Sequence, residues 1–105
     1  MTHTNELDFL PKVLGEHRAL QILRIMVNPS CNRSATDRLL HDCLEICGLY
    51  CARPALRKLL DDMEARGLLV THKAEDCIVA RLTEKGERVG LGKDRIEGVA
   101  TFYPD

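Results

Sequence analysis

The sequence predicts an α+β domain, and three observations support this class. Apolar residues recur at helical spacing in three segments between residues 6 and 66, which indicates amphipathic helices. Two runs rich in β-branched residues follow between residues 68 and 82, separated by a polar tetrapeptide as in a hairpin. The 105 residues, 45% hydrophobic and 30% charged, suit one globular domain over 1–105, with residues 1–5 and about 93–105 as candidate flexible arms.

The first helix is expected over Glu6–Val27, where leucines and other apolar residues repeat at spacings of three and four. Gly15 interrupts this stripe and allows a bend. Pro11 offers an alternative start, because proline fits the first turn of a helix and would leave the preceding residues as a frayed arm. Pro29 ends the helix, since it cannot continue one and biases Asn28 away from helical angles.

The second helix is expected to begin after Ser34 or Thr36, either of which offers a side-chain oxygen as an N-cap. Asp37 then lies in the first turn, where the helix dipole favours an anion. The apolar pattern continues to Cys47. Gly48 is a stop signal, because glycine adopts the left-handed backbone conformation at little cost.

The third helix is expected over Ala52–Arg66, after the short turn Leu49–Cys51. Pro54 lies in its first turn, where the missing N–H costs nothing, and Gly67 ends it. Its inward stripe consists of leucines and a methionine, namely Leu56, Leu59, Leu60 and Met63. Two helices joined by a short turn that carries a glycine indicate a helix-turn-helix.

Two strands are expected at Leu68–His72 and Cys77–Leu82, with Lys73–Asp76 as the polar tip of a hairpin. Thr83 begins a last short helix that loses order at residues 90–92. This order of elements predicts a winged helix-turn-helix with a three-helix core, a two-stranded β wing and a short C-terminal helix. In such a fold the polar segment Ser30–Ala35 would hold a minimal strand.

Two motifs resemble those of MarR-type and ArsR-type winged-helix regulators. Leu56–Val70 is similar to the pattern LxxxLxxLxxxGLV, and Leu82–Gly86 matches the LTxxG that follows the second wing strand. Almost the whole chain also resembles a family of small winged-helix proteins encoded by Mu-like phages and prophages. The matching segments are Arg18–Met26, Leu40–Leu49, Gly67–Val70, Leu82–Gly92 and Glu97–Val99. This resemblance implies a winged-helix fold and a phage or prophage origin.

The third helix carries the strongest signal for DNA binding. Arg53, Arg57 and Lys58 lie on the outward side of its N-terminal half, with no acid among residues 52–60. A helix in the major groove uses such residues for base edges and phosphates, and arginine pairs bidentately with guanine. Acids at 61, 62 and 64 oppose this, and a net charge of −1 provides no general basic excess. An ordinary solvated helix face is the alternative.

Further candidate DNA contacts lie outside this helix. His72 and Lys73 in the wing are expected to contact the DNA backbone, although Glu75 and Asp76 oppose them. Arg38 is expected to add a phosphate contact near the second helix, as are Arg33 and His41, with Asp37 and Asp42 offsetting them. The leading hypothesis is therefore a phage-encoded transcriptional regulator or accessory factor that binds double-stranded DNA. The alternative is a protein-interaction module, such as an assembly or packaging accessory, that binds no DNA.

No enzyme, metal or cofactor is expected. The chain has no glycine-rich phosphate loop and no arrangement typical of a nucleophile and its base. His41, Cys43, Cys47 and Cys51 raise a zinc site as an alternative, but their spacing lacks a paired Cys-x2-Cys motif. Cys43 and Cys47 lie on the inward stripe of their helix, where cysteine acts as a small hydrophobe.

Location and self-association complete the expectations. The five cysteines are an odd number and lie mostly in apolar patterns, which suits a reducing cytoplasm. No segment reads as a signal peptide or a membrane span. A homodimer is expected through the first helix and the C-terminal residues Ile96, Val99, Phe102 and Tyr103, unless these close the core of the monomer.

Overall fold

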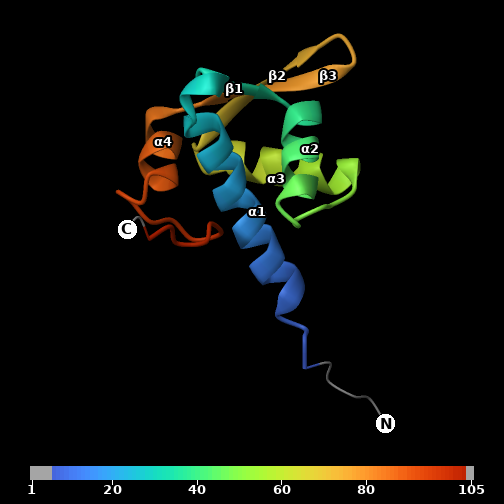
Figure 1. Ribbon diagram of the computed structural model, residues 1–105, viewed down its shortest axis with the longest axis vertical. Coiled ribbons are helices and arrows are strands. Elements are labelled where there is room, and N and C mark those ends of the chain that lie inside the picture. The colour runs from blue at the N-terminus through green and yellow to red at the C-terminus, as the bar shows by residue number, and fades with distance from the viewer. Residues whose placement is uncertain (1–5, 104–105) are drawn as a thin grey trace.

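The computed structural model describes residues 6–103 and has the expected α+β class (Figure 1). The helices of this part are α1 Leu10–Val27, α2 Asp37–Ile46, α3 Arg53–Ala65 and α4 Glu84–Gly90, with a 3-10 turn, η1, at Pro29–Cys31. The strands are β1 Ser34–Thr36, β2 Leu69–Ala74 and β3 Cys77–Leu82. None of the helices in the described range is both long and apolar enough to cross a membrane.

The three strands form an antiparallel sheet in the order β1-β3-β2. Ala80 of β3 lies between Ala35 of β1 and Thr71 of β2, so β3 is the central strand. The hairpin is longer than expected, because β2 continues to Ala74 and pairs there with Cys77. Lys73 is therefore a strand residue, and the expected tip Lys73–Asp76 shrinks to a two-residue turn.

The helices pack around α1, which crosses the molecule between α2 and α4 (Figure 1). The core draws on all four helices and on one face of the sheet, and its fully buried large apolar side chains are Ile22, Leu23, Met26, Leu40, Leu44, Leu56, Leu60, Met63, Leu68 and Leu69. The first turns of α1 project beyond this core (Figure 1). The burial of each of these core side chains contributes roughly 1.5–3 kcal/mol to the free energy of folding.

Local capping explains where the elements begin and end. Thr36, not Ser34, is the N-cap of α2, and its hydroxyl accepts from the Leu39 N–H at 3.1 Å. Thr83 caps α4 in the same way through the Gly86 N–H. The first helix begins at Leu10 with a proline in its first turn, which is the later of the two expected starts.

The C-terminal segment packs against its own domain. Val99 is buried in the core, and Ile96 and Phe102 are half-buried against it. The Ala100 N–H donates to the Glu16 carbonyl of α1 at 3.0 Å. The stretch named as an arm at about 93–105 is therefore docked as far as it is described, whereas residues 1–5 lie outside the described range.

Candidate nucleic-acid interface

The N-terminal half of α3 exposes two unpaired cations. Arg53 is the first residue of the helix and Lys58 lies in its second turn; both are exposed, and no carboxylate within residues 6–103 forms an ion pair with either. The N-cap residue, Ala52, provides no side-chain cap. Backbone N–H groups at this helix start are therefore left to water or to an external acceptor.

Arg57 differs from these two cations, because it is paired with Asp37 of α2. The Asp37 carboxylate is 1% exposed, and its Oδ2 lies 3.4 Å from both Nε and Nη2 of Arg57. Its Oδ1 accepts from the Ile78 N–H of β3 at 3.1 Å. Asp37 therefore connects α2, α3 and β3, in addition to its expected place in the first turn of α2.

Only one of the three acids of α3 lies among the exposed cations. Glu64 turns toward β2, where its carboxylate accepts from the Thr71 hydroxyl at 2.6 Å and the Thr71 N–H at 3.2 Å. These hydrogen bonds hold the pKa of Glu64 below its ordinary value. Asp62 lines a cleft on the opposite flank. Asp61 follows Arg57 by one helical turn and remains on the outward face.

The structure separates the two expected wing contacts. Successive strand residues point to opposite faces, so His72 and Lys73 cannot share one. Thr71, which bonds to α3, is on the same face as Lys73. Lys73 thus lies on the α3 side of the hairpin, and His72 lies on the outer side with Val70. Both side chains are exposed.

Arg38 contributes to a shallow hollow between α2 and the start of α3. Arg38, His41, Asp42 and Arg53 line this hollow. The Nη2 of Arg38 also lies 3.1 Å from Oδ2 of Asp76 at the hairpin turn, which links α2 to the wing. Both partners are exposed, so this ion pair is worth about 1 kcal/mol or less.

His41 also lines the hollow, and the sequence offers it both as a phosphate contact and as a candidate zinc ligand. Its ring meets the ring of Tyr50 edge to face, with 5.3 Å between centroids. Its Nδ1 lies 4.0 Å from Oδ1 of Asp42, while Nε2 is buried with no hydrogen-bond partner. The contact with Tyr50 could not be predicted from the sequence, because Tyr50 reaches His41 only after the α2–α3 turn folds back.

The five cysteines are free thiols. Burial, and then the neighbouring Cys31 and Cys47, raises the pKa of the Cys43 thiol. Such a thiol stays protonated and is a poor nucleophile and metal ligand. Over residues 6–103 no three His, Cys, Asp or Glu side chains are close enough together to hold a metal ion.

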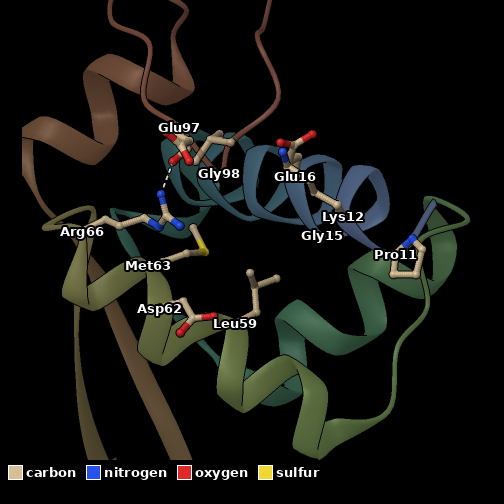
Figure 2. Close-up of a pocket in the computed structure, with 11 residues that line it drawn as sticks. Pro11, Lys12, Gly15, Glu16, Leu59, Asp62, Met63, Arg66, Glu97 and Gly98 are labelled. Atoms are coloured by element: carbon tan, nitrogen blue, oxygen red, sulfur yellow. Dashed lines mark hydrogen bonds between the residues drawn. The ribbon is translucent and has the colours of Figure 1, made fainter. Parts of the chain in front are cut away.

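A second depression, here called the α1–α3 cleft, lies at the other end of α3 (Figure 2). Leu59, Met63 and Val99 provide its apolar surface, between the first turns of α1 and the segment after α4. Arg66 donates to the Glu97 carbonyl at its edge, as the dashed line in Figure 2 shows. The lining of the α1–α3 cleft is partly apolar, which distinguishes this cleft from the polar hollow between α2 and the start of α3.

The surfaces expected for self-association differ in how much apolar area they leave exposed. Of the C-terminal residues, Val99 is in the core and Ile96 and Phe102 pack on it, so only Tyr103 remains largely exposed. The projecting start of α1, by contrast, exposes 56% of Phe9 and 38% of Leu10. The candidate surface therefore narrows to this helix start and the adjoining cleft.

Comparison with known proteins gives one informative similarity. Over 92 residues the chain is 32% identical to "Uncharacterized protein gp26" of Escherichia phage Mu, a match that covers 88% of this chain and 94% of that protein. No family model matches the chain, and no solved structure does. The expected similarity to a Mu-type phage protein is thus confirmed. The resemblance to MarR-type and ArsR-type regulators stays a prediction.

Proposed function

We propose that the chain, which belongs to the family of the phage Mu protein gp26, is a winged-helix protein that binds double-stranded DNA. In this proposal α3 enters the major groove with its N-terminal half foremost. Arg53 and Lys58 contact the DNA directly, and Lys73 contacts the backbone from the α3 side of the wing. A phage regulator or accessory DNA-binding factor would use such a module.

The order of the elements supports the winged-helix part of the proposal. A helix, a minimal strand and the α2–α3 pair are followed by a β-hairpin, as the sequence predicts. The short β1 pairs with β3 and so joins the helical part to the wing. Asp37 fixes the same junction from within, because it binds both the Arg57 guanidinium and the Ile78 N–H.

One observation carries the DNA-binding part. At the exposed, uncapped start of α3, Arg53 and Lys58 form no ion pair with any residue of 6–103, and Arg38 lies beside Arg53 in the same hollow. Phosphate neutralisation by such cations supplies most non-specific affinity for DNA. Glu64 opposes it less than the sequence suggested, because its carboxylate is occupied by Thr71.

Fluorescence anisotropy with a 20-base-pair duplex, across a series of salt concentrations, tests the proposal. The double variant Arg53→Gln/Lys58→Gln should bind about tenfold more weakly at low salt. It should also lower the slope of log affinity against log salt by about 2, one for each lost phosphate contact.

The matched control removes two cations from the exposed segment after α4, through Lys93→Gln/Arg95→Gln. This control has the same net charge as the α3 variant but leaves α3 intact. An equal loss of affinity in both variants would refute a localised interface. A parent protein that binds no duplex even at low salt would refute DNA binding altogether.

The second candidate is a protein-interaction module without DNA binding, and the exposed start of α1 favours it. Phe9 and Leu10 lie exposed beside the α1–α3 cleft, where a partner or a second copy would cover them. Sedimentation equilibrium of the parent and of Phe9→Asp measures self-association here. A concentration-dependent dimer lost in Phe9→Asp supports the second-copy arrangement, and a parent that remains monomeric at every concentration contradicts it.

A further inference from the structure

The hollow between α2 and the start of α3 is lined by two arginines and a histidine, with one acid beside them: Arg38, Arg53, His41 and Asp42. We propose that this hollow binds a phosphate group and that Asp76 of the hairpin turn competes with the phosphate for Arg38. The proposal rests on the proposed function only for the source of the phosphate, which would then be a DNA strand.

The chemistry of the lining favours a phosphate. Guanidinium groups present planar donors that match phosphate oxygens, and two arginines from different helices line this hollow. The uncapped start of α3 lies at the same place, since Arg53 is its first residue. The Nε2 of His41 is buried with no hydrogen-bond partner among residues 6–103, so His41 contributes a wall to the hollow but no exposed Nε2 donor. Asp42 is the one acid of the lining, 4.0 Å from the imidazole Nδ1.

Asp76 holds the position of an internal competitor. Its Oδ2 lies 3.1 Å from Nη2 of Arg38, so a carboxylate already occupies part of the fork that a phosphate would use. The neighbouring Glu75 is exposed and forms no ion pair with the residues that the structure describes. The two acids of the hairpin turn therefore carry equal charge and differ in whether they contact Arg38.

Inorganic phosphate is the first probe, followed through the His41 imidazole resonances by NMR, with chloride at equal ionic strength as the reference. The parent should give a saturable shift that Arg53→Gln abolishes. Asp76→Asn should bind phosphate about threefold more tightly, because loss of an exposed ion pair frees the Arg38 donors. Glu75→Gln should bind as the parent does. No saturable shift, or an equal gain in both variants, would overturn the proposal.

A cycle with Arg38→Gln tests the competition itself. In the Arg38→Gln background, Asp76→Asn should lose its threefold gain, since nothing remains for the carboxylate to release. If the gain persists there, Asp76 acts through general charge and the competition is refuted.

The same variants titrated with the DNA duplex separate this inference from the proposed function. Phosphate binding with no duplex binding would leave the hollow standing and remove DNA as the source of the phosphate. Duplex binding that responds equally to Asp76→Asn and Glu75→Gln would leave DNA binding standing and refute the competition.

Discussion

The two halves of α3 are held in different ways. In the C-terminal half, Glu64 binds Thr71 of β2, Arg66 binds the Glu97 carbonyl, and the Arg66 carbonyl accepts from Lys85 of α4 at 2.9 Å. In the N-terminal half, Arg53 and Lys58 are exposed and form no ion pair within the described part of the chain, and the helix start lacks a side-chain cap.

This difference shows how a short helix can be held in place at one end and still present its other end to a ligand. Hydrogen bonds to three other segments set the position and direction of α3 from its C-terminal end. The N-terminal end can then present cations to a ligand without carrying part of the fold. Arg57 is the exception, since its bond to the buried Asp37 joins the exposed half to the core.

The largest effect is expected when this exception is removed. Asp37→Ala strands the Ile78 N–H and leaves Arg57 without its partner, which should lower the free energy of unfolding by about 2–3 kcal/mol. Urea denaturation measures it. Glu45→Ala, an exposed position of the same helix, is the control and should stay within about 0.5 kcal/mol of the parent. Equal stability of the two variants would contradict the junction role of Asp37.

Much of the fold, and less of the site, could be predicted from the sequence. Caps and stops such as Thr36 and Gly48 act within a few residues, so the helix boundaries follow from local pattern. The bond between Asp37 and Arg57 joins two helices, and nothing in the local pattern showed that the acid would be buried.

The opposite orientation of His72 and Lys73 in the wing could have been predicted from the sequence. Alternation along a strand places neighbouring residues on opposite faces, so His72 and Lys73 could have been separated once the strand was extended to Ala74. The docked C-terminal segment gave no such signal, because its sparse apolar residues Ile96, Val99 and Phe102 lack any regular period.

A smaller effect is expected at the anchored end of α3. Gly98 has φ +92°, and an added Cβ would lie 2.6 Å from the Arg66 guanidinium. Gly98→Ala should therefore cost about 1–2 kcal/mol in thermal or urea unfolding. Gly15→Ala is the opposite case, since its Cβ would meet nothing within 4 Å in a helix interior, and it should stabilise by about 0.5–1 kcal/mol. The same sign for both changes would contradict this comparison.

Substitutions in the exposed half of α3 should change the affinity for DNA and not the stability of the fold. Asp61→Asn removes the carboxylate that shares the outward face with Arg57, so duplex binding by anisotropy should tighten about threefold. Asp62→Asn removes the same charge from the side of the α1–α3 cleft. It should change the affinity less than Asp61→Asn does, and the reverse order would mean that the other flank of α3 faces DNA.

The smallest effect concerns pH. Because hydrogen bonds from Thr71 lower the pKa of Glu64 in the folded state, its contribution to stability is present above the unfolded pKa of about 4.3. That contribution is lost as the pH falls through the lower folded value. The Tm difference between the parent and Glu64→Gln should therefore shrink from pH 6 to pH 3. Glu75→Gln should show no such narrowing, and a constant Glu64→Gln difference would argue against the Thr71 bonds.

The docking of the C-terminal segment on α1 has a consequence for synthesis on the ribosome. Val99 belongs to the core and the Ala100 N–H bonds to the Glu16 carbonyl, so the surface of α1 that they cover stays open until residues 99 and 100 have emerged. Nascent chains of this protein should therefore pass through a stage in which α1 has been synthesised but its apolar surface is still exposed, because residues 99 and 100 follow later. Until residues 99 and 100 are made, this surface is open to chaperones and to misassembly.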